Sequence, residues 1–190
     1  MVIPKARRAP QWSRMPHRLR SSAHVSGLPD LLPKDRSAAE LGNALLAASM
    51  RIMRELIPHG FPLVVENPRS SYLWEMPSMK KLLGHRSVCT AECDQCMYGC
   101  AWKKPTRFLL SDGMPASHLS KTCRGLRGRC ARTKQKHYVL SGFADGAWRT
   151  TQAKVYSNQL CSAIVSVFVD HWRLRHMERN WKAASPPLRI

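Results

Sequence analysis

Glu66, Asn67 and Pro68 follow directly on the apolar run from Phe61 to Val65. If that run is a buried strand, Glu66 stands at its carboxyl end, where open α/β sheets bind their ligands. A carboxylate there can exchange a proton or a hydrogen bond with a bound molecule. We therefore predict a catalytic or binding site at Glu66, Asn67 and Pro68. The alternative is that Glu66 caps the following helix.

Four cysteines fall within a short stretch and could bind a metal as thiolates. Their spacing is Cys89-x3-Cys93-x2-Cys96-x3-Cys100. Structural zinc sites usually take ligand pairs from separate loops, so a second group could complete the site: Cys123, Cys130 and His137. The sequence leaves three readings open, which are a zinc site, a metal cluster, and small free cysteines that bind nothing.

The densest basic region begins after the cysteine stretch. Its members that could contact phosphates are Lys103, Lys104, Thr106, Arg107, Lys121, Arg124, Arg127, Arg129, Arg132, Lys134 and Lys136. Tyr98, Trp102 and Tyr138 could stack on bases. We predict nucleic-acid contacts above all for Lys103, Lys104, Thr106, Arg107, Arg124 and Arg127. A solvated basic loop with the aromatic rings in the core is the alternative.

The charge balance points to an anionic partner. The 190 residues suit one domain, and 44% hydrophobic content is enough for a core. A net charge of +19, from 31 Lys and Arg against 12 Asp and Glu, indicates nucleic acid. A GC-rich genome or a poorly constrained reading frame would also enrich the chain in arginine. No apolar run reaches the roughly 20 residues of a membrane span. Seven cysteines without an export signal indicate reduced thiols and an intracellular protein whose compartment is not specified.

The apolar pattern predicts an α/β fold. Ser37-Ala38-Ala39-Glu40 has the spacing of a capping box and opens a helix that ends near His59-Gly60. The run 61–65 reads as a strand inside a parallel sheet, since it is apolar without polar alternation. Further elements are expected as short helices at 70–74 and 77–83, a strand at 106–110, an irregular basic insert at 115–136, and a long helix after Thr151.

These elements define three parts of the chain. Residues 1–36 are predicted to be a basic, largely disordered arm, residues 37–172 an α/β domain, and residues 173–190 a basic tail. The long helix is expected to bury one face, formed by Leu160, Ile164, Val167, Phe168 and Trp172.

A set of short motifs, taken in order, carries a resemblance to a known family. The motifs are Leu19-Arg20-Ser21, Gly27-Leu28-Pro29, Gly42-Asn43, Glu66-Asn67-Pro68-x-x-Ser71, Cys96-Met97-Tyr98-Gly99, Lys104-Pro105-Thr106, Cys130, His137, Leu140-Ser141-Gly142 and Ala153-x-x-Tyr156-x-x-x-Leu160-Cys161. Over 16–169 the chain resembles the C-terminal part of a divergent group similar to cytosine-5 DNA methyltransferases, found in phage and in repetitive protist sequences. The resemblance implies part of a Rossmann-like, class I methyltransferase-like sheet.

The resemblance also implies roles for individual residues. In that family a Glu-Asn-Val motif binds the flipped base, so Glu66 would be the base-binding acid, Asn67 would brace the loop and Pro68 would stiffen it. Proline here replaces the family's valine. The family's Pro-Cys nucleophile and its S-adenosylmethionine loop precede the region that Leu19 begins, and neither motif occurs in this chain.

Two functions from different classes follow from the sequence. The first is a truncated methyltransferase-like domain that binds DNA, binds no cofactor by itself, does not methylate DNA alone and pairs with a polypeptide that supplies the missing half. S-adenosylmethionine belongs to the full-length family. Whether the chain is an enzyme is therefore left open. The alternative is a non-enzymatic, basic nucleic-acid-binding protein with a zinc-bound cysteine cluster. A decaying mobile-element frame without function is the third reading.

Overall fold

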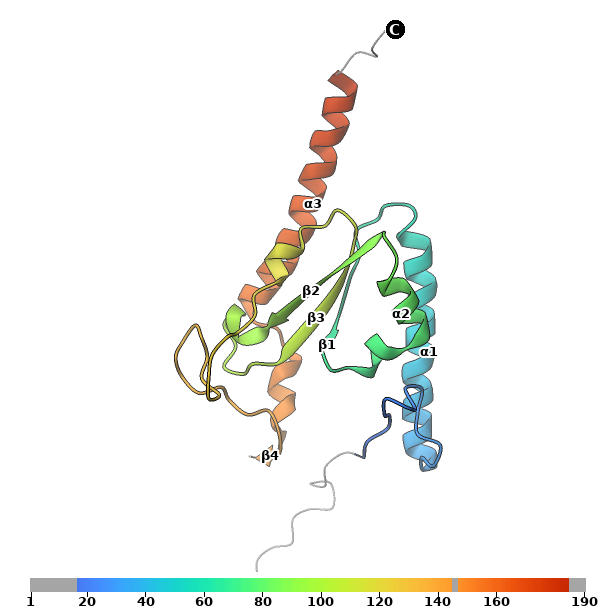
Figure 1. Ribbon diagram of the computed structural model, residues 1–190, viewed down its shortest axis with the longest axis vertical. Coiled ribbons are helices and arrows are strands. Elements are labelled where there is room, and N and C mark those ends of the chain that lie inside the picture. The colour runs from blue at the N-terminus through green and yellow to red at the C-terminus, as the bar shows by residue number, and fades with distance from the viewer. Residues whose placement is uncertain (1–16, 145–146, 185–190) are drawn as a thin grey trace, which may run out of the picture.

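The computed structural model describes residues 17–144 and 147–184. Its main elements are α1 (Pro33–Leu56), β1 (Val64–Pro68), α2 (Pro77–Leu83), β2 (Val88–Asp94), β3 (Pro105–Ser111) and α3 (Asn158–Ala184) (Figure 1). Short elements link them: η2 (Tyr72–Glu75), η3 (Gln95–Tyr98), η4 (Ala116–Leu119), β4 (Phe143–Ala144), β5 (Ala147–Trp148) and η5 (Arg149–Lys154). The chain is thus a mixed α/β protein, as the sequence predicts. Among the described residues, no helix is long and apolar enough to cross a membrane.

The main sheet has three strands in the order β1-β3-β2, and β3 pairs antiparallel with both neighbours. The predicted parallel pairing of the first strand is therefore wrong. The run 61–65 leads into β1, a half-buried edge strand, whereas the fully buried apolar run is Phe108, Leu109 and Leu110 on the central strand β3. β1 and β2 consequently run in the same direction and end together, since Pro68 and Cys93 both lie opposite Thr106.

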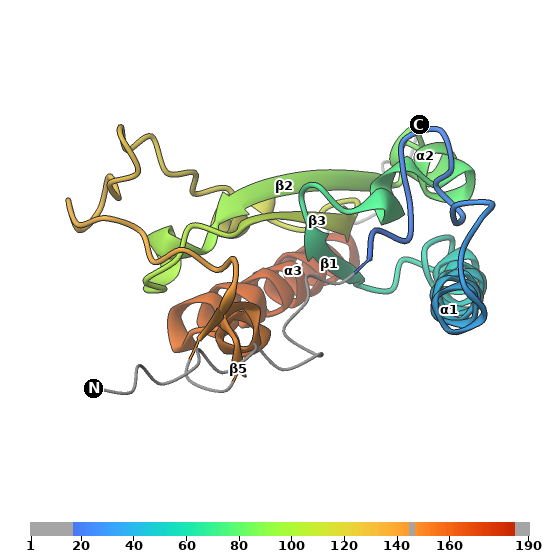
Figure 2. The ribbon, with the colours of Figure 1, turned by 90° about the horizontal axis from the view of Figure 1, so that it is seen from below.

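Helices cover both faces of this sheet, so the protein has three layers (Figures 1 and 2). Successive side chains of a strand point to opposite faces. Leu109 therefore joins the core under α1 and α2 with Met50, Met53, Trp74 and Met79. The next residues on either side of Leu109 face α3.

The core on the α3 side forms around Phe108 and Leu110 of β3, which pack with Leu160 and Val167 of α3. Ile164 and Phe168 lie against this cluster as predicted. Trp172 does not, because 59% of its surface is exposed, and it contacts His176 instead, with ring centroids 4.0 Å apart. The prediction of a buried Trp172 is wrong, because its neighbour His171 takes the inward position on α3, where it is 7% exposed and its Nδ1 lies 3.2 Å from the Gly113 carbonyl oxygen. α3 itself continues beyond the sheet (Figure 1).

The predicted boundaries shift at both ends of the domain. α1 begins at Pro33, which suits a first helical position, and the Ser37 hydroxyl donates to the Pro33 carbonyl (3.0 Å) instead of capping the helix. The border predicted at residue 37 therefore lies inside α1. Residues 17–32 fold against this helix, whereas 1–16 of the predicted arm lie outside the described residues. α3 continues through Ala184, so 173–184 of the predicted tail are helical.

The middle of the chain follows the sequence closely, with one omission. α2 spans Pro77–Leu83 as predicted, and β3 contains the strand predicted at 106–110. The first strand lies three residues later than expected, and Phe61 is 55% exposed. Sequence reasoning missed β2, Val88–Asp94, because only Val88 and Thr90 favour a strand and the other residues are cysteines, acids and an alanine.

Candidate functional site

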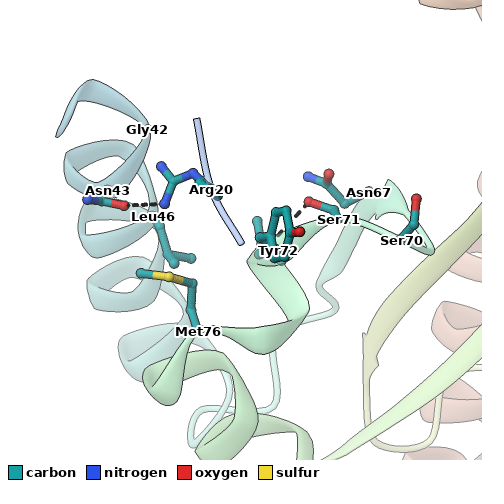
Figure 3. Close-up of a pocket in the computed structure, with 10 residues that line it drawn as sticks. Arg20, Gly42, Asn43, Leu46, Asn67, Ser70, Ser71, Tyr72 and Met76 are labelled. Carbon is teal, nitrogen blue, oxygen red and sulfur yellow. Dashed lines mark hydrogen bonds between the residues drawn. The ribbon is translucent and has the colours of Figure 1, made fainter. Parts of the chain in front are cut away.

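A pocket of about 320 Å³ lies between α1 and the loop that follows β1 (Figure 3). Its polar lining comes from three segments that are distant in sequence: Arg20, Asn43, Asn67, Ser70, Ser71 and Tyr72. Leu46, Leu73 and Met76 supply its apolar wall. Among the described residues that line it, none is acidic. The pocket therefore offers hydrogen bonds and one positive charge on an apolar base, which suits a polar or anionic ligand.

Arg20 lies against α1 in a fixed position. Its Nη1 donates to Asn43 Oδ1 (2.8 Å) and its Nη2 donates to the Ala39 carbonyl (2.9 Å). The Asn43 amide nitrogen in turn donates to the Ser26 carbonyl (2.8 Å). Arg20 has no carboxylate partner among the described residues, so its charge is not neutralised. Gly42 allows this approach, because a Cβ there would lie 3.1 Å from Arg20 Nη2.

Three polar side chains that line the pocket have no hydrogen-bond partner in the described part of the chain. Within the described part of the chain, the amide of Asn67 and the hydroxyls of Ser70 and Tyr72 make no hydrogen bond. Asn67 and Tyr72 are half-buried and Ser70 is exposed. These groups can donate to and accept from a ligand without breaking an existing bond.

The loop that carries these groups is firmly held. The Ser71 hydroxyl caps η2 by accepting from the Leu73 N–H (3.2 Å). Trp74 is 2% exposed, and its indole N–H donates to the Pro68 carbonyl (2.9 Å). The loop is therefore pinned at its centre by a buried ring, which pre-organises Asn67 and Tyr72.

Glu66 and Asn67, predicted to act together, point to opposite faces of the sheet because they are adjacent on β1. Asn67 lines the pocket, whereas Glu66 faces α3, where its Oε2 accepts a hydrogen bond from the Tyr156 hydroxyl. Glu66 Oε1 is buried and has no partner. Burial, together with the bond to Glu66, raises the pKa of Tyr156. Pro68 is exposed and ends the strand.

Four of the predicted nucleic-acid residues are engaged within the protein. Lys103 Nζ lies 3.7 Å from Asp94 Oδ2, and Lys104 Nζ donates to the Ala153 carbonyl (2.9 Å). Arg107 pairs with Glu92 through Nη2 and Oε1 (2.7 Å). Thr106 is fully buried, and its hydroxyl donates to the Lys104 carbonyl (3.1 Å). A ligand cannot reach Thr106, which corrects its assignment as a contact.

Arg124 and Arg127, the other two, are exposed on a long loop that we call the basic loop, residues 121–138. Seven Lys and Arg residues fall within 121–136, and no acid occurs between 113 and 144. Arg149 lies over the Tyr138 ring at the end of this loop, 5.4 Å from its centroid. The basic loop therefore presents positive charge that no acid of its own segment neutralises.

Four ligand-type side chains converge where the basic loop meets η3. The thiols of Cys96, Cys123 and Cys130 and a ring nitrogen of His137 all lie within 4.8 Å of one another. The cysteines are 0%, 6% and 4% exposed, in that order. Of the cysteine stretch predicted from its spacing, only Cys96 takes part, and the downstream group that the sequence offered as a second set supplies the others.

Backbone donors surround this cluster. The Ala131 N–H donates to Cys123 Sγ (3.2 Å), and Cys123 Sγ lies 3.7 Å from His137 Nε2. Burial would raise the pKa of Cys130, but the N–H groups of Thr133 and Arg132 and the His137 ring outweigh it and lower the pKa to about 6. Cys96 differs, since burial and the two neighbouring thiols raise its pKa. All seven cysteines of the chain are free thiols.

The pocket and the cluster occupy the same end of the sheet. The pocket loop follows the end of β1, the cluster begins just after β2, and those two strands end side by side in register with β3. A ligand that reached from one site to the other would therefore cross the carboxyl ends of β1 and β2. Comparison of the chain with known protein families, curated proteins and solved structures found no significant match in any of the three.

Proposed function

We propose that this protein binds DNA and holds an unstacked nucleotide in the pocket between α1 and the β1 loop. The observation that carries the proposal is the convergence of Arg20, Asn43, Asn67 and Ser71 on one pocket from three distant segments. Each of these residues belongs to a motif of the methyltransferase-like resemblance. A DNA methyltransferase-like domain that retains a nucleotide pocket accounts for their assembly.

The chemistry of the pocket fits a nucleotide. The Asn67 amide can both donate to and accept from a base edge, as asparagine does when it reads bases. The uncompensated guanidinium of Arg20 suits a phosphate. The Tyr72 ring and the apolar wall can contact the faces of a base that has left its stack.

The basic loop supplies the sequence-independent part of the affinity. Arg124 and Arg127 are exposed and project from a segment without acids, so they can contact phosphates and release counterions. We therefore expect the logarithm of the affinity to fall linearly with the logarithm of salt concentration. Arg124→Ala should reduce that slope by about 1.

Glu66 is a second candidate for the base-binding residue. Its Oε1 is buried without a partner. A hydrogen bond from a donor on a ligand would stabilise a carboxylate oxygen in that position. A base bound there would lie on the α3 face, not in the pocket. Glu66→Gln keeps the shape of the side chain and removes its acid, so it separates the two candidates.

The test uses the full chain and a DNA oligonucleotide that carries one 2-aminopurine, whose fluorescence rises when it leaves the stack. Binding is followed by anisotropy and unstacking by the fluorescence rise. Asn67→Ala should reduce the rise at saturating protein and weaken binding about tenfold, the effect of one good base contact. Because the Asn67 side chain makes no hydrogen bond in the protein, this variant should keep its stability.

Gln152→Ala removes an exposed amide elsewhere and serves as the control. It should leave both signals unchanged. A rise that Asn67→Ala preserves and Glu66→Gln abolishes would move the base site to Glu66. Binding without any fluorescence rise would show that the protein contacts only the DNA backbone. Tighter binding to RNA of the same sequence would show that RNA, not DNA, is the ligand.

A further inference from the structure

We propose that Cys96, Cys123, Cys130 and His137 bind one zinc ion that fastens the basic loop to the sheet. Their ligand atoms lie within 4.8 Å of one another. Sulfur atoms at about 2.3 Å from a tetrahedral zinc are about 3.8 Å apart, so the observed positions need only a small contraction. Three thiolates and one imidazole make a ligand set that structural zinc sites use.

The ligands connect two parts of the fold. Cys96 lies on η3, which follows β2 and is packed into the protein, and its side chain is fully buried. The other three lie on the basic loop at equal spacings of seven residues. An ion held by all four would therefore tie the loop to the end of the sheet. Every coordination position would be filled by protein, which indicates a structural ion and not a catalytic one.

Little apolar packing holds the basic loop, although hydrogen bonds such as that from the Tyr138 N–H to the Ala101 carbonyl (2.9 Å) tie it down. Among residues 121–138 the only buried side chains are Cys123 and Cys130. Leu126, the loop's aliphatic residue, is 81% exposed. Seven positive charges in this segment repel one another. Two thiols alone bury too little apolar surface to order such a chain, whereas a metal bond set can.

Outer contacts orient the ligands, as they do in metal sites. Asp94 is 3% exposed, and its Oδ2 accepts a hydrogen bond from the Cys123 N–H (2.7 Å). Arg132 Nε donates to the Cys96 carbonyl (2.8 Å), which joins the loop to η3. Gly125 permits the close fold of the loop, because a Cβ there would lie 1.8 Å from the Arg129 carbonyl oxygen.

The four remaining cysteines have other surroundings, and Cys89 packs against the core under α3. Cys93 belongs to the core under α3, and Cys100 Sγ lies 3.9 Å from Gln95 Oε1. Cys161 is exposed on α3. None of these thiols belongs to the cluster. Substitution of these cysteines provides matched controls, because each substitution removes a thiol that is not one of the proposed zinc ligands.

The experiment measures the metal content of the full chain, purified without added chelator, by mass spectrometry. We expect one zinc per chain. Cys123→Ser and His137→Ala should each lose most of it, while Cys161→Ser and Cys100→Ser should keep it. In the unaltered chain, cobalt exchanged for zinc should give the intense visible absorption of a tetrahedral thiolate site, which tests the geometry without any variant.

Several results would overturn the proposal. They are metal-free protein that binds no cobalt, zinc that Cys123→Ser and Cys161→Ser retain equally, and iron with acid-labile sulfide in place of zinc. Metal content is measured without nucleic acid, so this inference stands or falls separately from the proposed DNA binding.

Discussion

The pocket between α1 and the β1 loop lies at the same end of the sheet as the basic loop, but the two are held in different ways. The pocket rests on packing, because Trp74, Met50 and Met79 are buried beneath it and neutral hydrogen bonds fix its rim. The basic loop has no comparable core, and its two buried side chains are both cysteines. Two segments at the same end of a sheet can therefore be ordered by different interactions. The pocket is built by the packing of the sheet and helices, whereas we propose that the loop depends on a bound zinc ion.

The largest effect should come from removing the ring beneath the pocket. Trp74→Ala deletes a buried side chain and the indole bond to the Pro68 carbonyl, so the free energy of unfolding should fall by about 3–5 kcal/mol. Urea unfolding measures it. Protein that remains folded should still contain zinc, since no cluster residue contacts Trp74.

Trp172→Ala is the matched control for that change. Trp172 is 59% exposed, so its loss should alter the free energy of unfolding by no more than about 0.5 kcal/mol. Equal effects of the two substitutions, or loss of zinc in folded Trp74→Ala, would show that pocket and loop share one support.

Gly125→Ala should disturb the basic loop and leave the pocket intact. A Cβ at Gly125 would lie 1.8 Å from the Arg129 carbonyl oxygen, so Gly125→Ala cannot keep the loop folded as it is. We expect this variant to lose zinc and to be cut rapidly by trypsin within 121–136, with the sheet domain still folded by circular dichroism.

Gly128→Ala offers the comparison for the loop. A Cβ at Gly128 meets nothing within 4 Å, and only its positive φ of 73° opposes the change. It should keep zinc and resist trypsin at a cost of about 1 kcal/mol in stability. If Gly125→Ala retains zinc and trypsin resistance as well, the loop is not ordered in the way described.

The smallest effect should appear at high pH and concerns Tyr98, which is buried in the core on the α3 side and whose hydroxyl accepts from the Lys121 N–H at the start of the basic loop. Burial raises the pKa of Tyr98 to about 12, although the Lys121 N–H partly opposes the shift. The folded state therefore favours the neutral phenol, whose hydroxyl donates to the His118 carbonyl (2.7 Å). An unfolded tyrosine ionises near pH 10, so stability is fully present below about pH 10 and falls as the pH rises toward about 12.

Tyr98→Phe isolates this contribution. The variant should be about 1 kcal/mol less stable at pH 7, because one hydrogen bond is lost, but its stability should fall less than that of the unaltered protein between pH 10 and 12. Chemical denaturation at several pH values measures the difference. Parallel curves for the two proteins would contradict the raised pKa of Tyr98.

The sequence predicted the elements better than their arrangement. α2, β3 and the long helix followed from proline, glycine and apolar spacing. The antiparallel pairing did not, because an apolar strand reads alike whether its buried neighbours are parallel or antiparallel. β2 was missed since cysteine and acidic residues hide a strand whose inward face is Ala91 and Cys93.

The sites were only partly predictable. Spacing drew attention to the stretch from Cys89 to Cys100, of which only Cys96 joins the cluster, and to Cys123, Cys130 and His137 as a second group. Only the fold brings Cys96 to that second group. Arg20 and Asn43 were noted as parts of short motifs, yet their meeting with Asn67 depends on how residues 17–32 fold back on α1. Successive side chains of a strand point to opposite faces of the sheet, so the sequence of β1 could have shown in advance that Glu66 and Asn67 lie on different faces.

Hydrogen exchange of the full chain, measured with and without a DNA oligonucleotide, tests our proposal that DNA contacts both the pocket and the basic loop across the carboxyl ends of β1 and β2. We expect DNA to slow exchange in two separate segments, the pocket loop at 67–73 and the basic loop at 121–136, and to leave exchange in α3 unchanged. Protection confined to the basic loop, or spread evenly over all basic surfaces, would contradict it.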